Sequence, residues 1–175
     1  MEEPETSLMQ INVLPATSEH EPVLSNLLEL YAHDFSEFSD LKIGADGRFG
    51  YEQLPLYWRE PDRFPFLVTA NDGLAGFVLI QQGSQVSGAG QVWDMAEFFV
   101  LRGYRRHGVG LRVAHDVWKM FPGHWEVRVT DKNLVAQEFW KHAISRFTGV
   151  HAESILTEVA AKRWHVFSFF SNSHN

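Results

Sequence analysis

Fourteen consecutive residues in the second half of the chain decide its fold: Glu-Phe-Phe-Val-Leu-Arg-Gly-Tyr-Arg-Arg-His-Gly-Val-Gly, from Glu97 to Gly110. The segment starts with aromatic and β-branched residues, which are typical of a strand. It continues through a basic loop marked by glycines. After Gly108 the apolar residues recur at helical spacing as far as Phe121. The segment therefore predicts a strand, a basic glycine loop and a helix, in that order.

The loop is suited to binding a diphosphate. The N-terminus of a helix presents unpaired backbone N–H groups and carries about half a positive charge. Gly108 and Gly110 bear no side chain that would keep a phosphate away from these amides. The loop is neither a Walker loop, which ends in Gly-Lys-Ser/Thr, nor a G-x-G-x-x-G loop. Charged side chains would add hydrogen bonds, so we predict a pyrophosphate site formed by Arg105, Arg106, His107, Gly108, Val109 and Gly110.

The same loop carries a family resemblance. Arg105-x-x-Gly108-x-Gly110 resembles the Q/R-x-x-G-x-G/A signature of the GNAT acetyltransferase superfamily. A hexapeptide of this kind recurs by chance, and its alternative interpretation is a glycine-broken turn with solvated arginines. Its context adds weight, because residues 97–105 resemble spermidine/spermine acetyltransferases in particular. Downstream, Asn133-x-x-Ala136-x-x-Phe139-Trp140 falls where the family has an Asn-to-aromatic helix motif.

Outward from this segment, the sequence predicts one domain over residues 9–170 of an α/β class. Hydrophobic periodicity and turn residues set the expected elements. The expected strands are 10–14, 66–70, 74–81, 92–101, 125–129, 154–159 and 163–170, and the expected helices are 17–38, 108–121 and 134–147. This order resembles the GNAT fold, which implies a mixed, mostly antiparallel sheet of about six to seven strands with about four helices.

Composition excludes several classes of function. The net charge of −7 disfavours a nucleic-acid surface, which needs clustered Lys and Arg. The apolar stretches are shorter than the roughly 20 residues that span a membrane. Without cysteine the chain has neither disulfides nor thiolate metal sites, and its nine histidines show no ligand spacing, so we expect no metal. The acidic residues after Met1 differ from a secretory signal, so we expect a cytoplasmic protein.

The resemblance implies acetyl-CoA as co-substrate and assigns residues to it. Pantetheine would enter a gap between the fourth and fifth strands and pair with backbone groups of the Phe98, Phe99 and Val100 stretch. Asn133 would contact the pantetheine arm, and Phe139 and Trp140 would pack beside it. From spacing alone, Asn133 is equally well explained as the N-cap of the helix that follows.

Two carboxylates are candidates for the general base that deprotonates the amine. By resemblance, Asp94 matches the base of histone-type acetyltransferases, whereas Glu97 matches an acidic residue that contacts substrate in polyamine-type enzymes. Strand side chains alternate, so the two point to opposite faces unless a bulge intervenes. We favour Glu97, because the residues around it match best; its alternative interpretation is a solvent-facing strand residue.

One position departs from the family pattern. Many GNAT enzymes place a tyrosine in the corresponding helix to protonate the leaving thiolate, and this chain has Trp140 there. An indole N–H donates hydrogen bonds but is not a practical acid. Tyr104, Tyr51 and His142 are substitutes that the sequence offers. The departure leaves open a non-catalytic acyl-CoA-binding or sensing module.

The acceptor is the least defined feature. Residues 39–65 are glycine-marked and aromatic, which is typical either of a binding wall or of a packed loop. On the first interpretation Tyr51 and Trp58 bind a small cationic amine or a peptide, together with Glu97. Carboxylates flank this segment and form either an acidic mouth or a solvated surface: Asp34, Glu37, Asp40 and Asp46. The late strands could pair between subunits, so a homodimer is left open.

Overall fold

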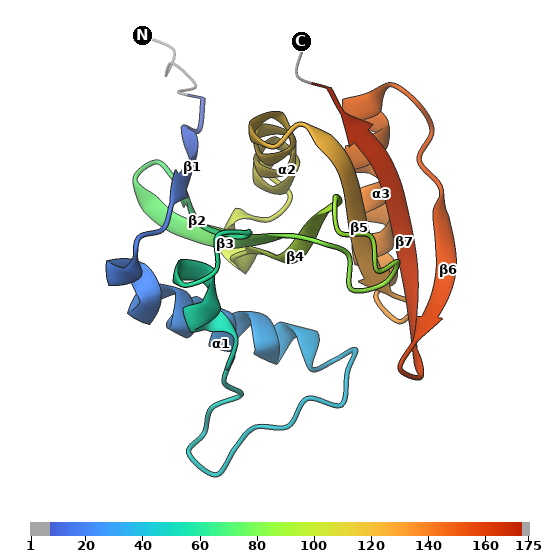
Figure 1. Ribbon diagram of the computed structural model, residues 1–175. Helices are drawn as coiled ribbons and strands as arrows, with labels where there is room; N and C mark the ends of the chain where they lie inside the picture. The colour runs from blue at the N-terminus through green and yellow to red at the C-terminus, as the bar shows by residue number, and fades with distance from the viewer. Residues whose placement is uncertain (1–7, 173–175) are drawn as a thin grey trace, which may run out of the picture.

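The computed structural model describes residues 8–172 (Figure 1). Within this range the chain forms seven strands, three α-helices and three short 3-10 helices. The strands are β1 (Ile11–Pro15), β2 (Arg63–Ala70), β3 (Gly73–Gln82), β4 (Trp93–Val100), β5 (Gly123–Thr130), β6 (Ser154–Val159) and β7 (Lys162–Ser171). The helices are η1 (Ser18–His20), α1 (Glu21–Phe35), η2 (Leu54–Trp58), η3 (Arg102–Tyr104), α2 (Val109–Met120) and α3 (Leu134–Thr148).

The strands form one sheet in the order β1-β2-β3-β4-β5-β7-β6. All neighbours are antiparallel except β4 and β5, which run parallel and pair only at Trp93–Trp125 and Asp94–Glu126. Beyond these pairs β4 and β5 separate, so β5, β7 and β6 swing away from the first four strands (Figure 1). The sheet therefore has a gap in the middle, at the C-terminal ends of two parallel strands.

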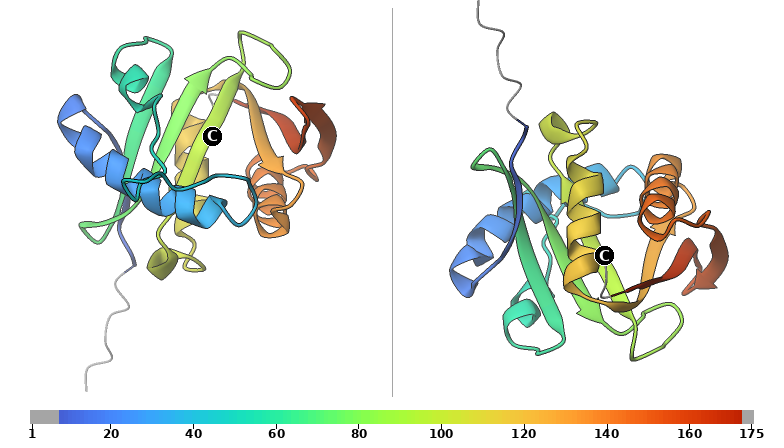
Figure 2. Two further views of the ribbon diagram at one scale, coloured as in Figure 1. Left: turned by 90° about the horizontal axis from the view of Figure 1, so that it is seen from below. Right: turned by 90° about the horizontal axis from the view of Figure 1, so that it is seen from above.

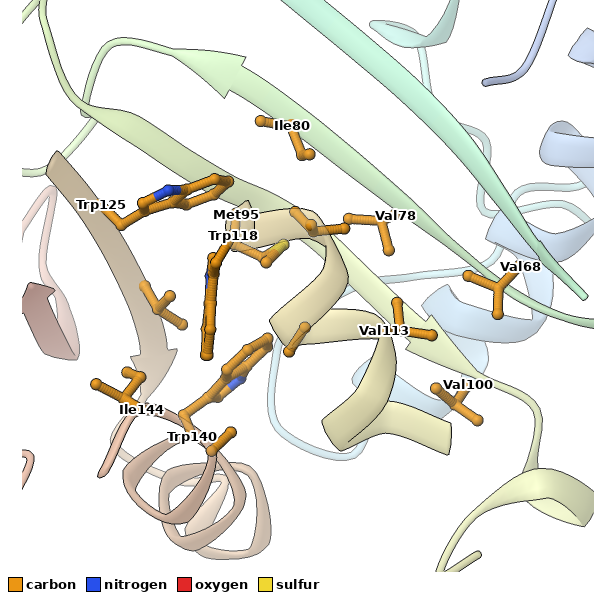
Figure 3. Packing of buried hydrophobic residues seen from close by; sticks show 14 of the residues in the cluster. Val68, Val78, Ile80, Met95, Val100, Val113, Trp118, Trp125, Trp140 and Ile144 are labelled. Carbon is orange, nitrogen blue, oxygen red and sulfur yellow. The ribbon is translucent and has the colours of Figure 1, made fainter. Parts of the chain in front are cut away.

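The helices cover both faces of the sheet: α1 lies on one face, and α2 and α3 lie on the other (Figure 2). The α1 face buries Leu24, Leu27 and Leu28 against Phe77 and Leu79 of β3. The opposite face holds the larger core, in which Trp118, Trp125 and Trp140 pack around α2 (Figure 3). Each face of the central strands is thus covered by a different set of helices.

The order of elements and the mixed sheet confirm the sequence-based fold prediction, with a few differences in the bounds. There are three α-helices among residues 8–172, where about four were expected. β2 begins at Arg63 and includes Pro65, which the sequence placed in the loop. This proline lies just beyond the residues of β2 that pair with β1, so its missing N–H removes no bond between them.

None of the helices within residues 8–172 is both long enough and apolar enough to span a membrane.

Candidate functional site

The gap between β4 and β5 opens into a cavity of about 320 Å³. Its wall on one side of the sheet comes from α1 and the loop after it, and on the other side from α3. The cavity passes between the strands and therefore joins the two faces of the sheet. The lining includes Tyr31, Phe35, Phe49, Tyr51, Ala96, Glu97, Phe98, Arg128, Asn133, Ala136, Trp140 and Trp164.

A bulge in β4 determines which side chains face the cavity. Glu97 pairs with Leu79 and Met95 pairs with Ile80, so Ala96 is an extra residue without a partner on β3. Such a residue resets the alternation of side chains along the strand. As a result Asp94 and Glu97, which strict alternation would separate, both lie on the α1 face, level with Gln81 and Leu79.

Glu97 is the one carboxylate among the described residues that line the cavity. The Tyr51 hydroxyl donates to its Oε1 at 3.1 Å. Burial raises the pKa of Glu97 above its ordinary value, and the Asp94 charge adds to the rise. Hydrogen bonds from Tyr31 and Tyr51 and the charge of Arg128 act in the opposite direction without cancelling it. A carboxylate with a raised pKa is a stronger base, as proton removal from an amine requires.

Asp94, by contrast, is occupied by other side chains. Its Oδ2 accepts hydrogen bonds from Gln81 Nε2 at 3.0 Å and from Arg128 Nη2 at 3.2 Å. Burial raises the pKa of Asp94, and the neighbouring Arg128 charge lowers it in part. Since Asp94 lies behind the cavity lining while Glu97 forms part of it, the geometry favours Glu97 as the base.

The predicted phosphate loop has the geometry of an anion site. Gly108 precedes α2 with a φ of 78°, in the left-handed region, and a Cβ built on it would contact nothing within 4 Å. The first bond inside the helix runs from Arg112 N–H to Gly108 O, so the amides of Val109, Gly110 and Leu111 come before it. Arg106 also has a positive φ, of 63°, and its side chain and that of His107 are exposed.

Gly110 has a packing role in addition to the one predicted. A Cβ at this position would approach the ring of Phe139 to 3.2 Å. Its missing side chain therefore admits α3 against α2, and Phe139 also packs on Phe98 with ring centroids 5.9 Å apart. Gly108 supplies the open space at the helix mouth, whereas Gly110 supplies close helix packing.

Arg105 is engaged within the protein. Its Nε donates to Val100 O at 2.7 Å, and its Nη2 donates to Asp34 at 2.6 Å. Arg102 reaches the other oxygen of Asp34, also at 2.6 Å. Asp34 is partly buried, but these two arginines hold its pKa below the ordinary value. The ion-paired Asp34 thus joins α1 to the start of the loop, and Arg106 and His107 are the exposed basic side chains there that form no ion pair within residues 8–172.

The gap suits a pantetheine arm. Leu101 N–H bonds to Ala75 O on β3, so alternation turns the backbone groups of Phe98 and Val100 toward the gap. Phe99 points its ring into the α1-face core instead, against Phe77 and Tyr31. An extended ligand could therefore pair with β4 where β5 has moved away. The Val100 carbonyl is taken by Arg105, so the open groups are the Phe98 N–H and C=O and the Val100 N–H, which together with the bare helix mouth fit acetyl-CoA.

Two of the three residues predicted at α3 and its N-cap, Asn133 and Trp140, line this cavity. Asn133 Oδ1 accepts from Ala136 N–H at 3.0 Å, which makes Asn133 the N-cap of α3, and the residue lines the cavity as well. Both sequence-based interpretations of Asn133 are therefore compatible with its position. Trp140 is buried, lines the cavity and packs edge-on against Phe98 at 4.9 Å.

The two predicted acceptor residues separate in the structure. Tyr51 lines the cavity, whereas Trp58 packs in the α1-face core and donates from Nε1 to Ala16 O at 2.9 Å. Tyr57 is buried next to it, and burial and the Glu97 charge raise the pKa of Tyr57 to about 12. Besides Tyr51, two residues were proposed as replacements for the missing tyrosine acid. His142 is exposed on α3, and the Tyr104 hydroxyl lies beside Gly73, at the β2–β3 turn.

Among the cavity residues that sequence reasoning missed are three with polar or aromatic side chains: Tyr31, Arg128 and Trp164. They come from α1, β5 and β7, and each sits in an ordinary amphipathic pattern. The one available signal was Arg128, a charged residue between Val127 and Val129 in a strand close to the sheet centre. Within the described residues, no cluster of three His, Asp or Glu side chains could hold a metal ion.

Comparisons with known proteins agree with this architecture. A model of the Acetyltransferase (GNAT) family matches residues 24–143. Curated protein sequences give no match. Among solved structures, an acetyltransferase from Thermus thermophilus has a TM-score of 0.67 at 13% identity, covering 93% of this chain and 98% of its own.

Two further structures share the fold. Arabidopsis thaliana NAA60, in complex with a bisubstrate analogue, has a TM-score of 0.61 at 15% identity and covers 94% of this chain and 100% of its own. A spermidine N-acetyltransferase SpeG chimera from Vibrio cholerae and hSSAT has a TM-score of 0.59 at 10% identity, covering 93% and 96%. At such low identities the likeness concerns the fold alone.

Proposed function

Because the chain belongs to the GNAT acetyltransferase family, we propose that it transfers an acetyl group from acetyl-CoA to a primary amine of a small molecule or peptide. One observation carries the proposal: the gap between β4 and β5 holds a cavity with a partly buried carboxylate, Glu97, and the strand that bears Glu97 leads on to the bare mouth of α2. The amides of Val109, Gly110 and Leu111 would hold the pyrophosphate. The backbone groups of Phe98, with the N–H of Val100 beside them, would hold the pantetheine arm.

Bound acetyl-CoA supplies an acetyl group activated as a thioester. The protein must then provide a neutral amine, because an ammonium has no free electron pair. Glu97 accepts the proton that the amine loses as its nitrogen bonds to the acetyl carbon and the carbon–sulfur bond breaks. The Val100 N–H, which faces the gap, is placed to donate to the acetyl oxygen as negative charge develops on it. The thiolate takes up a proton and leaves as the coenzyme A thiol.

A non-catalytic acyl-CoA sensor is the second candidate, and Trp140 is the observation that favours it. This indole lines the cavity where the family resemblance implies a tyrosine acid. The departure is compatible with catalysis, because the coenzyme A thiolate is a good leaving group that water can protonate. Tyr31 and Tyr51 also bring hydroxyl groups to Glu97, from α1 and the loop.

Release of free thiol from acetyl-CoA, measured with a panel of primary amines, separates these two functions. The enzyme hypothesis expects amine-dependent thiol release and a matching N-acetylated product by mass spectrometry. The sensor hypothesis expects acetyl-CoA to raise the melting temperature while no amine in the panel gives product. Absence of both thiol release and thermal stabilisation would contradict both, and with them the assignment of the phosphate loop.

A further inference from the structure

Arg128 is an arginine of β5 with unused donors at the acceptor side of the cavity. Its side chain is 15% exposed, and its ring contact is with Trp164, 5.7 Å from the guanidinium carbon. Nη2 donates to Asp94 at 3.2 Å. Nε is buried and has no hydrogen-bond partner within residues 8–172. Guanidinium carries five N–H donors, and leaving a buried donor unpaired is unfavourable. Because Nε is closed to a ligand, the donors that can meet an oxygen in the cavity are the terminal N–H groups on Nη1 and Nη2 that do not bond to Asp94.

The charges around Arg128 indicate what kind of oxygen this is. The Arg128 charge is already opposed by that of Asp94, with which it forms a partly buried ion pair. Glu97 then provides one unmatched negative charge in the same cluster when it is ionised. A bound ammonium neutralises Glu97, so the cluster balances without any further charge. A neutral carbonyl oxygen satisfies the free N–H groups of Arg128, whereas a carboxylate would add a charge beside Asp94 and Glu97.

From these contacts we propose that the acceptor is an α-amino carbonyl compound, whose amine binds at Glu97 and whose neighbouring neutral carbonyl oxygen is held by Arg128. The aromatic lining from Tyr31, Phe35 and Trp164 suits an apolar side chain on the same α-carbon. The cavity of about 320 Å³ lies at the small end of the roughly 300–1,000 Å³ that is usual for ligand sites. One amino-acid residue, either free as an amide or at the start of a peptide, matches this description.

This inference rests on the proposed acetyltransferase function, because the amine must reach Glu97 beside the thioester. Three compounds with the same benzyl group isolate the role of the carbonyl: phenylalaninamide, phenylalanine and phenethylamine carry a neutral carbonyl, a carboxylate and neither. Their amines differ in basicity, which alone changes the reactive fraction at a given pH. The informative quantity is therefore the ratio between wild type and variant for one compound, in which this difference cancels.

The variant is Arg128→Lys, which keeps a positive charge for Asp94 but removes the planar fork and Nε. Arg163→Lys is the matched control, since Arg163 lies on β7 next to Trp164, pairs with Asp131 at 3.5 Å and is 55% exposed. We expect Arg128→Lys to lower kcat/KM for phenylalaninamide by about tenfold or more, mainly through KM. For phenethylamine we expect Arg128→Lys to change kcat/KM by less than about twofold. We expect the Arg163→Lys control to leave kcat/KM unchanged for all three compounds. If peptides are accepted as substrates, the tripeptide Phe-Gly-Gly should show the same loss of kcat/KM in Arg128→Lys as phenylalaninamide.

Isothermal titration of the same compounds into the coenzyme A-bound protein supplies affinities that do not depend on turnover. Tighter binding of phenylalaninamide than of phenethylamine, lost in Arg128→Lys, supports the inference even where no thiol is released. Equal losses for all three compounds would show that Arg128 is merely structural and overturn it. Wild-type binding of phenethylamine as tight as that of phenylalaninamide would overturn it too. Thiol release with phenethylamine in that case leaves the acetyltransferase function standing.

Discussion

The phosphate loop follows β4 and the acceptor pocket is lined by it, but the two are built in different ways. The loop is one short segment, 105–110, which acts mainly through backbone amides and one left-handed glycine. The pocket gathers side chains from α1, the loop after it, β4, β5 and β7. The first can be recognised from six consecutive residues, whereas the second exists only once the sheet has formed.

The two ends also differ in how they treat charge. At the loop, Asp34 pairs with Arg102 and Arg105, and the exposed Arg106 and His107 adjoin a helix mouth that attracts anions. At the pocket, burial raises the pKa values of Asp94 and Glu97, and Arg128 lowers them only in part. On the proposed function, coenzyme A would bind at a site open to solvent, and acetyl transfer would take place at a site partly withdrawn from it.

The largest effect is expected at the loop. Gly108→Glu forces a side chain into a left-handed backbone and places a negative charge at the helix mouth. We expect coenzyme A affinity to fall by about 100-fold or more, measured by isothermal titration. Gly90→Glu is the control, because Gly90 is exposed and lacks a positive φ. Unchanged affinity in Gly108→Glu would refute the assignment of the loop.

Substitution of the base affects turnover and leaves cofactor binding intact. Glu97→Gln is expected to lower kcat at neutral pH by about 100-fold or more. The deficit narrows at high pH, where the amine loses its proton unaided. Glu158→Gln, an exposed change on β6, should leave kcat as it is. If Asp94→Asn reproduces this pH pattern while Glu97→Gln does not, Asp94 is the base.

Removal of one hydroxyl group has a smaller effect. The Tyr51 hydroxyl hydrogen bond lowers the pKa of Glu97, so Tyr51→Phe raises that pKa further. Because Glu97 must be ionised to act, the acid limb of the kcat/KM profile moves to higher pH, by about one unit or less. Tyr104→Phe removes a hydroxyl beside the β2–β3 turn and serves as control. A shift to lower pH would contradict the proposed contact.

The smallest effect concerns stability. Burial raises the folded-state pKa of Glu97 above its unfolded value, so the native state binds this proton more tightly. Stability is therefore lost as pH rises from the unfolded pKa through the folded one. Glu97→Gln removes the loss of stability caused by ionising this buried group. We therefore expect calorimetry at pH 8 to show a melting temperature higher by roughly 2–4 °C than that of the wild type. At pH 4 the gain shrinks. A lower melting temperature at pH 8 would show that ionised Glu97 stabilises the fold.

The contrast between loop and pocket also explains what could be predicted from the sequence. Strand alternation, turn residues and the amphipathic helices are local, and they predicted the order of elements correctly. The strand, glycine loop and helix around Gly108 were likewise local. The same reasoning cannot find partners that are distant in sequence, such as Asp34 with Arg105 or Tyr31 with Glu97.

Residue type alone was also insufficient where two roles use the same residue. The sequence predicts Gly110 in the phosphate site, and its missing side chain also makes room for Phe139, which the sequence does not indicate. Trp58 looked like an acceptor residue, but it is tied to Ala16 in the α1-face core. In each case the role depends on a tertiary contact, and the neighbouring residues in the sequence do not indicate that contact.

Ala96 has a consequence for how this strand could change. As the unpaired residue of β4, it sets the parity of everything that follows it. If the same residues of β4 paired with β3 without the bulge, strict alternation would put Glu97 on the α2–α3 face of the sheet and Phe98 on the α1 face. Whether this strand presents a carboxylate to the cavity thus depends on the pairing register of β4, and the presence of a glutamate in the sequence is not sufficient.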